Sequence, residues 1–434
     1  MKKALLSLLM LFFMLIVTAQ NKWYTQGNFL PAKRIAITLT NILDFDRKDI
    51  PVAIPGSQFE FQDFQDFTVT IVDPSGEPRK DPGIKQPGNL GVHEIRGETN
   101  GRMIFHQVDD LDKDGIWDEL FFITDMKPKE TKTIYLYIGY NNRGWNPYTT
   151  AATIGSYVRH IVPFLENEYV GWKLWYPADC DVYAKRKPQL ITQKLSLENL
   201  DGYGVPHDMG SDIMGVGLSL GGGGMMMFDH PGRTDTASRP RFTPARKNAA
   251  VKTPFNVGQL TDSRYTFDVI VNGPIRSMVK VKTFNWNSGN GFYELEQIYT
   301  AYTRQNYATC KVKFTTFKPT NKNVWFGCGI KRHPGNELTL YKKNNIVVSG
   351  GHEEIVNPDN PNNKQTIVDY ISTAMIVKKK YQPELTMIKS DTITNYAFKI
   401  TPTKDRSFKY MIGAAWSEGP PFKTNEDFKK KFYD

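Results

Sequence analysis

The sequence predicts an all-β protein, in which an N-terminal β-sandwich is followed by a large antiparallel β-sandwich. Short runs of β-branched and aromatic residues recur along the 434 residues, and proline, glycine and aspartate separate them. The gaps between the runs have the length of hairpin turns, whereas a parallel sheet would require helical segments between its strands. The sequence has no convincing long amphipathic helix and no internal repeat.

The first 20 residues, MKKALLSLLMLFFMLIVTAQ, have the layout of a secretory signal peptide. Two lysines precede an unbroken apolar run, and the small residue Ala19 lies near its end. We therefore expect residues 1–19 to be cleaved off after Ala19 and the mature chain to be secreted or periplasmic. No later segment approaches the roughly 20 apolar residues of a membrane-spanning helix, so no membrane span is expected.

Two domains are expected, because 434 residues exceed the ~250–300 residues that one hydrophobic core supports. The first domain, residues 20–145, has strand signals in RIAITLTN, FTVTIVD, LFFITDM and TIYLYIGY. The polar, turn-rich stretch NNRGWNPYTTAATIG follows, and it predicts a linker that runs to about residue 155.

The second domain, residues 155–434, is the expected catalytic domain and is equally rich in strand signals. They include YVGWKLWY, YTFDVIVNG, SMVKVKTFNW, YELEQIYTAYT, ATCKVKFTTF, NVWFGCGI and FKYMIGAAW. The polar, basic and proline-containing residues 231–258 predict an exposed loop inside this domain.

The charge favours acidic partners without naming them. The formal net charge is +10, and loss of Lys2 and Lys3 with the signal peptide reduces it to +8. Solubility alone is an equally good explanation of this excess. Nucleic acid is not expected as a partner, because an exported protein rarely meets it and no reading motif is present. An anionic oligosaccharide is the better candidate.

The three cysteines are too few, and odd in number, for a disulfide framework. Cys310 and Cys328 lie in neighbouring strand-like runs, which leaves a disulfide between them open. The alternative is that all three, Cys180 included, are small buried apolar residues.

An acidic stretch in the first domain, DLDKDGIWDE, has the spacing of a calcium loop. Its aspartates occupy the first, third, fifth and ninth positions that calcium ligation requires: Asp110, Asp112, Asp114 and Asp118. The twelfth position should be a glutamate but is Phe121, and a strand-like run follows. Two interpretations therefore remain, a calcium-binding hairpin loop with a structural ion or a purely structural turn. No cofactor is expected to be required for catalysis.

The second domain holds a dense group of cations, acid/base side chains and aromatic rings within about 55 residues. Aromatic rings stack on sugar faces, cations bind carboxylates, and histidine or tyrosine transfers protons near neutral pH. The candidate catalytic residues are His207, Tyr203, Arg159 and Lys185. The candidate substrate-binding residues are His160, Glu166, Trp172 and Asp208.

Other motifs in this domain do not support a site. The run GVGLSLGGGG lacks the ending of a phosphate-binding loop, and its glycines indicate a close backbone approach or a bulge. Ser219 lacks the strand-to-helix turn of a nucleophile elbow. The seven histidines show no metal-ligand spacing.

Several motifs in order, DLDKDGIWDELFF, ENEYVGWKLWY, DVYAKR and DMGSDIMGVGLSLGGGG, resemble a family of secreted Bacteroidetes proteins catalogued as a domain of unknown function (DUF4861). The resemblance implies a large sandwich like the supersandwich of galactose mutarotase. It also implies a place among enzymes that degrade uronate-rich polysaccharides such as pectin and ulvan, with dehydration of a terminal uronic acid as one associated activity.

Uronate dehydration is a β-elimination that requires a base, an acid and a cation beside the substrate carboxylate. His207 or Tyr203 has the right chemistry for the base and acid, and Arg159 or Lys185 for the cation. The alternatives are glycoside hydrolysis, with Glu166 or Asp208 and a second carboxylate, and a non-catalytic glycan-binding protein of a polysaccharide utilization system.

Overall fold

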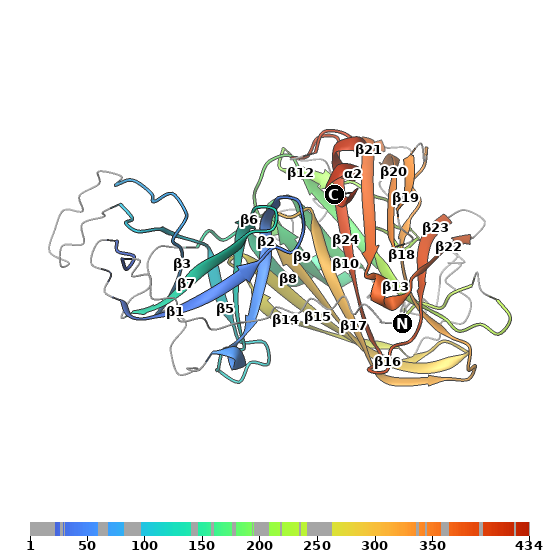
Figure 1. Cartoon of the computed structure of the whole chain (residues 1–434). Helices are drawn as coiled ribbons and strands as arrows, with labels where there is room; N and C mark the ends of the chain where they lie inside the picture. Colours follow the sequence, from blue (N-terminus) through green and yellow to red (C-terminus); the bar gives the residue numbers. More distant parts are fainter. Residues whose placement is uncertain are drawn as a thin grey trace. The chain divides into compact units, whose positions relative to one another are not determined.

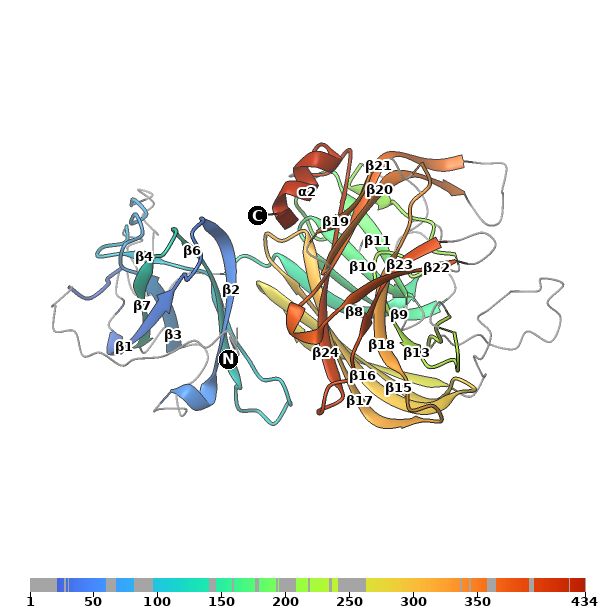
Figure 2. The same ribbon diagram turned by 45° about the vertical axis from the view of Figure 1, so that its right-hand side comes forward.

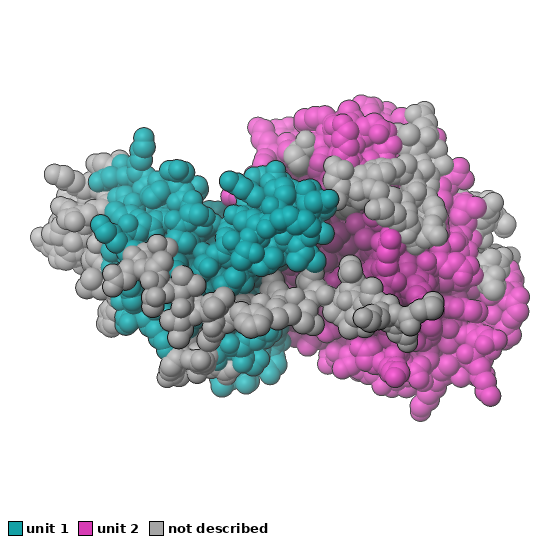
Figure 3. Space-filling model, viewed as in Figure 1, with its two compact units in different colours: residues 1–147 teal, residues 148–434 magenta. Residues whose placement is uncertain are grey.

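The chain divides into two compact units, Met1–Pro147 (unit 1) and Tyr148–Asp434 (unit 2), which Figure 3 shows in different colours. The computed structural model describes residues 22–26, 29, 31–59, 68–81, 97–139, 146–157, 160–175, 179–192, 194, 208–217, 219–233, 236–240, 263–335, 338–342, 345–356, 364–389, 394–420 and 422–433. The predicted signal peptide lies outside these residues. None of the helices among them combines the length and the apolar character that a bilayer crossing requires.

Unit 1 is a sandwich of two antiparallel sheets. Its strands are β1 (Pro31–Thr40), β2 (Arg47–Pro55), β3 (Val69–Asp73), β4 (Arg102–Met103), β5 (His106–Asp109), β6 (Glu119–Met126) and β7 (Thr131–Gly139), with a 3₁₀ turn η1 (Gly56–Gln58). The sheets have the orders β1-β7-β3-β4 and β2-β6-β5. Alternate residues of the strands, such as Val52 and Ile54 on β2, enter a core shared by both sheets.

Unit 2 contains three further antiparallel sheets. Its first strands are β8 (Thr150–Tyr157), β9 (His160–Asn167), β10 (Val170–Trp175), β11 (Asp179–Lys185), β12 (Gly210–Asp212) and β13 (Gly224–Phe228). The long central strands are β14 (Arg264–Asn272), β15 (Arg276–Asn287), β16 (Gly291–Tyr302), β17 (Tyr307–Pro319) and β18 (Trp325–Lys331). The last elements are β19 (Leu338–Lys342), β20 (Ile346–Val356), β21 (Lys364–Val377), η4 (Lys379–Tyr381), β22 (Glu384–Lys389), β23 (Thr394–Ile400), β24 (Ser407–Trp416) and α2 (Asn425–Tyr433).

An eight-stranded sheet, β14-β15-β16-β17-β24-β21-β20-β19, forms one layer of unit 2 (Figures 1 and 2). A five-stranded sheet, β12-β11-β10-β9-β8, and a four-stranded sheet, β13-β18-β23-β22, form the other. One large core joins all three sheets, and it includes Trp172, Phe326 and Ile412. The predicted all-β architecture with a large antiparallel sandwich is confirmed.

The predicted linker is wrong at its C-terminal end. Thr150 to Gly155 belong to β8, which pairs with β9 along its whole length. The small and β-branched residues of TAATIG give a weak strand signal by themselves, and the pairing with β9 stabilises the strand.

The three cysteines are free and fully buried, so Cys310 and Cys328 form no disulfide. The glycine run makes the close approach that its sequence indicated: a Cβ on Gly221, where φ is +59°, would lie 2.2 Å from the carbonyl oxygen of Cys180. Ser219 is buried and donates to the carbonyl oxygen of Val216 at 2.6 Å, as a structural residue does.

The predicted exposed loop 231–258 is partly buried. Arg239 is 6% exposed, and its guanidinium binds the Asp179 carboxylate at 2.5 Å and the carbonyl oxygen of Ser219 at 2.8 Å. The basic composition suggested solvent exposure, but Arg239 pairs with a buried acid. Residues 241–258 lie outside the described residues.

Candidate functional site

The five-stranded sheet of unit 2 has one face toward the large core and one outer face. On β10 the residues Trp172 and Leu174 point into the core, so Lys173 between them points to the outer face. Trp172 is 1% exposed, which contradicts its predicted role in binding sugar. Its indole lies among apolar side chains, where no ligand can stack on it.

Lys185 and Glu166 form a salt bridge on this outer face, and both side chains are 0% exposed. The Lys185 ammonium also donates to the carbonyl oxygens of Asn167 and Gln189, the latter at 2.7 Å. Burial lowers the pKa of Lys185, and the Glu166 carboxylate opposes this shift. The salt bridge therefore occupies the Lys185 ammonium, and the covering residues keep ligands away from it.

The Glu166 carboxylate is equally occupied. It accepts hydrogen bonds from the backbone N–H groups of Ile191 at 3.0 Å and Thr192 at 2.9 Å, and from the Thr192 hydroxyl. The described contacts thus give both side chains a structural role, and the catalytic role of Lys185 and the substrate-binding role of Glu166 stay predictions. The segment around residues 189–192 covers the ion pair, which therefore has a structural role.

A second polar group on the same face is buried slightly less completely. Lys173 and Asp181 are opposite residues of β10 and β11, and their charged groups form a salt bridge of 3.0 Å. Asp212 on β12 lies beside them, in register with Tyr183 of β11. The Asp181 side chain and Asp212 each retain 8% exposure. This residual exposure distinguishes them from the Lys185–Glu166 pair, whose side chains are 0% exposed.

Asp212 has an unusual protonation equilibrium. Burial raises its pKa well above the ordinary aspartate value, and the negative charges of Asp181 and Glu353 act in the same direction. Lys173 and a hydrogen bond from the Met214 N–H at 3.0 Å oppose the shift without cancelling it. Asp212 is therefore a carboxylic acid that keeps its proton at pH values where an ordinary aspartate has lost it.

Three residues from the other sheets support the loop that follows Asp212. The Lys331 ammonium donates to the carbonyl oxygen of Gly215 at 2.7 Å and to the Glu353 carboxylate at 2.6 Å. The buried His333 binds the same carboxylate oxygen through Nδ1 at 2.7 Å and the Thr373 hydroxyl through Nε2 at 2.9 Å.

The protonation states of this supporting group follow from its contacts. Burial lowers the pKa of His333, so its ring is neutral near pH 7. Burial disfavours the charged form of Glu353, but the His333 hydrogen bond and the Lys331 charge outweigh it and lower its pKa. Glu353 is therefore a carboxylate that holds Lys331 in place, and Lys331 holds the Asp212–Gly215 loop.

Arg186, which follows β11, contributes a partly exposed cation that donates to the carbonyl oxygen of Gly210 at 3.3 Å. Its side chain is 27% exposed, pairs with Glu418 at 2.5 Å and lies over the Trp416 ring, with 5.1 Å between guanidinium carbon and ring centroid. The Arg186 charge lowers the pKa of Tyr183. Burial first, and then the charge of Asp212, raise this pKa by more, so the net shift is upward. The Tyr183 hydroxyl thus stays protonated beside Asp212.

The remaining predicted site residues are placed only in part. Arg159, Tyr203 and His207 lie outside the described residues. His160 begins β9, and Asp208 lies in an exposed turn just before β12. Among the described members of the predicted set, Lys185 and Glu166 meet in the closed ion pair. Trp172 lies in the core and Asp208 in a surface turn.

The residues that do converge were missed by the site prediction: Lys173, Asp181, Asp212, Lys331, His333 and Glu353. One signal was present in the sequence. A lysine between the apolar residues of VGWKLW and an aspartate in DCDVY each mark the outer face of a strand. The sequence does not show that β11 pairs with β12 or that β20 lies close by, because both depend on the fold.

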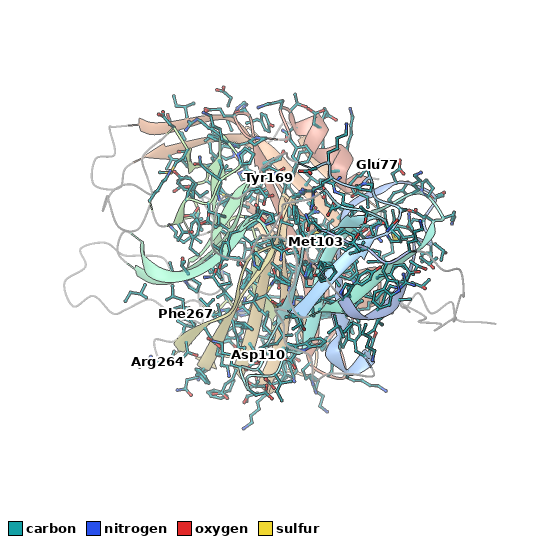
Figure 4. The ribbon with its side chains drawn as sticks, turned by 90° about the vertical axis from the view of Figure 1, so that its left-hand side faces the viewer. Glu77, Met103, Asp110, Tyr169, Arg264 and Phe267 are labelled. Carbon is teal, nitrogen blue, oxygen red and sulfur yellow. The ribbon has the colours of Figure 1, made fainter. Side chains whose placement is uncertain are left out.

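The acidic loop of unit 1 brings three of its four predicted ligands together; the label of Asp110 marks it in Figure 4. Carboxylate oxygens of Asp110, Asp112 and Asp118 lie within 4.8 Å of one another. Asp114 is not in this group, and its carboxylate accepts from the Ile116 N–H at 2.8 Å. Asp110 also accepts from the N–H of Gly115 at 2.8 Å, as a structural turn would require.

Comparison with solved structures finds distant similarity to two proteins of Enterococcus faecalis. An alpha-mannosidase from Enterococcus faecalis V583 aligns with a TM-score of 0.43 and 10% identity over 93% of this chain and 45% of that one. A protein in the Glycosyl Hydrolase Family 38 from Enterococcus faecalis gives 0.43 and 10% over 92% and 46%. The chain thus spans less than half the length of these proteins, and similarity at this level supports no conclusion about activity.

Comparison of the sequence alone gives a clearer result. No curated protein matches the chain. A family model described as "Domain of unknown function (DUF4861)" matches residues 85–433. The match covers more than half of the chain and all of the polar group around Asp212. The chain therefore belongs to the DUF4861 family, as its motifs indicated.

Proposed function

We propose that the protein is an exported carbon–oxygen lyase that acts on uronic-acid-containing oligosaccharides of the pectin or ulvan type. In this proposal a β-elimination removes water from a terminal uronic acid and leaves an unsaturated uronyl end. The observation that carries it is the position of the Asp212 carboxyl group, whose pKa is raised by burial, beside the Lys173–Asp181 ion pair on the outer face of the sheet.

The elimination breaks two bonds and forms one double bond. A base takes the proton from C5 of the uronate, the C5 electron pair forms the C4–C5 double bond, and the C4–O bond breaks. The departing 4-hydroxyl must receive a proton to leave as water. Asp212 is suited to this step, because a carboxyl group with a raised pKa keeps its proton to a higher pH and can act as a general acid.

Charge on the substrate carboxylate grows while C5 loses its proton, so a nearby cation lowers the barrier. Lys185 is closed off in its ion pair. We therefore assign this role to Lys173, whose charge acts on Asp212, or to the partly exposed Arg186, whose charge acts on the neighbouring Tyr183. Arg159 remains a predicted partner of the carboxylate. His207 or Tyr203 remains the predicted base.

Glycoside hydrolysis is the second candidate, and one observation favours it. Asp181 and Asp212 are two neighbouring carboxyl groups, of which Asp181 is held in an ion pair and Asp212 keeps its proton. One proton donor and one carboxylate are what glycoside hydrolysis requires. A glycan-binding protein without activity would use the same side chains as contacts only.

Incubation with saturated oligogalacturonates distinguishes the three candidates. Elimination creates a conjugated double bond, so ultraviolet absorbance rises while the number of reducing ends stays constant. New reducing ends without absorbance would replace the proposal with hydrolysis. Binding in the absence of both signals would reduce the role to glycan recognition.

For unit 1 we propose that the acidic loop binds a structural calcium ion. Calcium prefers hard oxygen ligands, and the carboxylates of Asp110, Asp112 and Asp118 supply three of them within 4.8 Å of one another. The ion would stabilise the turn between β5 and β6 and take no part in catalysis.

Calcium should therefore raise the melting temperature of the full chain relative to a chelator-treated sample. Binding to the folded state alone adds about 2.7 kcal/mol when free calcium is 100 times its Kd. Asp112→Asn should abolish this increase, whereas Asp44→Asn, an exposed aspartate of the same unit, should retain it. Equal melting curves of the parent with calcium and with chelator would show that the loop is a turn only.

A further inference from the structure

Glu353 has one carboxylate oxygen that its supporting role beside Asp212 does not use. Both donors that hold this side chain, the Lys331 ammonium at 2.6 Å and the His333 ring at 2.7 Å, bind the same oxygen, Oε1. Among the residues that the structure describes, none donates a hydrogen bond to Oε2. Glu353 is only 5% exposed, and the polar atoms of so deeply buried a side chain are normally hydrogen-bonded. Oε2 is therefore available to a donor from a ligand.

The fold sets the direction of the Glu353 side chain. His352 and Glu354, its neighbours on β20, are exposed, whereas Glu353 is buried and points to the inner face of the eight-stranded sheet. A Cβ built on the exposed Gly215 would lie 3.8 Å from Oε2. Apart from the chain neighbours of Gly215, no other atom of the described ranges would lie within 4 Å of it. Oε2 therefore faces an exposed point of the loop that follows β12.

Lys331 has an unused donor at the same place. Its ammonium carries three N–H groups, of which one binds Glu353 and one binds the carbonyl oxygen of Gly215 at 2.7 Å. The described part of the chain supplies no acceptor for the third, and the side chain is 12% exposed. This donor and Oε2 are neighbours, because both adjoin Oε1 of Glu353. We call Lys331 and Glu353 the hydroxyl-binding pair.

The unused donor and acceptor of this pair match a hydroxyl group. A hydroxyl donates one hydrogen bond and also accepts, so it can donate to Oε2 of Glu353 and accept from the Lys331 ammonium at the same time. A cationic ligand group would be repelled by Lys331, and an anionic one by Glu353. The two charges already compensate each other in their salt bridge of 2.6 Å, so a neutral ligand group leaves neither charge unpaired.

The hydroxyl-binding pair lies beside the Asp212 carboxyl group. Gly215 follows Asp212 by three residues, and the charge of Glu353 reaches Asp212, since it contributes to the raised pKa of that side chain. Oδ1 of Asp212 accepts from the Met214 N–H, and no residue within the described ranges binds the other carboxyl oxygen. Asp212 and Glu353 therefore each offer one carboxyl oxygen to a ligand.

We propose that the hydroxyl-binding pair holds the 3-hydroxyl of the terminal uronic acid and that Glu353 thereby determines specificity. This inference rests on the proposed function, in which Asp212 protonates the 4-hydroxyl. The 3-hydroxyl is next to the 4-hydroxyl on the side of the ring away from C5, so the substrate carboxylate stays away from the negative charge of Glu353. The substrates are then uronates with a free 3-hydroxyl, and units that carry an acetyl, methyl or sulfate group on O3 are excluded.

The test compares a saturated oligogalacturonate with the same chain carrying a 3-O-acetyl group on its terminal unit. Titration calorimetry measures the binding of both chains to the Asp212→Asn variant of the full mature chain, in which turnover does not interfere. The free chain should bind about tenfold or more tightly than the acetylated chain, because acetylation removes a hydrogen bond to a charged group.

Introducing Glu353→Gln into this background should abolish the preference. Lys331 and His333 both donate to Oε1, so the amide oxygen of glutamine takes the place of Oε1 and its NH₂ group takes the place of Oε2. An NH₂ group cannot accept from a hydroxyl, so affinity for the free chain should fall about tenfold or more. The acetylated chain should lose little. The Asp212→Asn background has no titratable group at that position, so the effect of Glu353 on the pKa of Asp212 does not enter.

The matched control is Glu354→Gln, which makes the same change at the next residue of β20, whose side chain is exposed. It should keep the preference for the free chain. An unchanged ratio of the two affinities in Glu353→Gln would overturn the proposal, whether both affinities stay or fall together. A parallel fall is the result expected if Glu353 only supports the loop.

Binding and turnover separate this inference from the proposed activity. A preference that depends on Glu353, together with no turnover by the parent protein, would leave the hydroxyl-binding pair standing and remove the lyase. Turnover of the free and the acetylated chain at equal rates by the parent protein would remove the role of the pair and leave the lyase.

Discussion

Asp212→Asn should reduce turnover of uronate oligosaccharides by about 10²–10⁴-fold while the protein stays folded. Asparagine has the same shape, and its carbonyl oxygen still accepts the N–H of Met214. It has no acidic proton to give to the departing hydroxyl. The activity of the parent should also fall as pH rises through the raised pKa of Asp212, because the acid then loses its proton.

The stability of the same variant tests the protonation state independently of activity. A raised pKa in the folded state means that the contribution of Asp212 to stability is present at low pH and is lost as pH rises through the folded pKa. Asp212→Asn removes this loss, so its free energy of unfolding at neutral and alkaline pH should equal or exceed that of the parent. Denaturant titrations over a pH series measure it.

Asp369→Asn is the matched control for this substitution, because Asp369 is an exposed aspartate of the same unit. It should leave activity and the pH profile unchanged. An Asp212→Asn variant with parental activity would remove Asp212 from the mechanism. A large loss of stability at neutral pH in that variant would show that Asp212 is an ionised structural residue.

Lys185→Met should destabilise unit 2 by about 3–5 kcal/mol, the largest stability effect expected among the residues discussed. The substitution leaves the Glu166 carboxylate fully buried without its cation. The hydrogen bonds from Ile191 and Thr192 remain, but they do not neutralise the charge. Urea unfolding of the parent and the variant measures the difference.

The double variant Glu166→Gln/Lys185→Met should recover part of this loss, because it removes the uncompensated charge as well as its partner. A Lys185→Met protein with parental stability but without activity would contradict the structural role. It would restore the interpretation of Lys185 as the cation that binds the substrate carboxylate.

The fold was largely predictable from the sequence because its signals are local. In VKVKTF on β15, for example, the alternation of valine with lysine predicts both a strand and the side that faces the core. The strand signal was too weak at β8, where residues Thr150 to Gly155 have the composition of a polar linker. Its strand conformation depends on pairing with β9, a contact that composition does not encode.

The sequence predicted the region of the chain that contains the candidate site, but not the residues that form it. Glu166, Trp172 and Lys185 were chosen because acids, cations and rings cluster there in sequence, yet strand alternation sends Trp172 into the core. Residues 189–192 close over the other two. Burial by a segment that follows the strand is a tertiary effect, so residue type alone could not reveal it.

Glu353 is a residue of the site that sequence reasoning could not find. It lies about 140 residues beyond Asp212 in sequence, and only the packing of the sheets brings its charge close enough to act on Asp212. The predicted chemistry, an acid and a base beside a cation, stays a prediction. The residues that provide it follow from the fold.

Mass spectrometry of the products formed from saturated oligogalacturonates tests the central claim most directly. A dehydratase predicts products that have lost one water per chain and kept their chain length, and Asp212→Asn should form almost none of them. Shorter chains that have gained water, or unchanged chains after incubation with the parent protein, would contradict the claim.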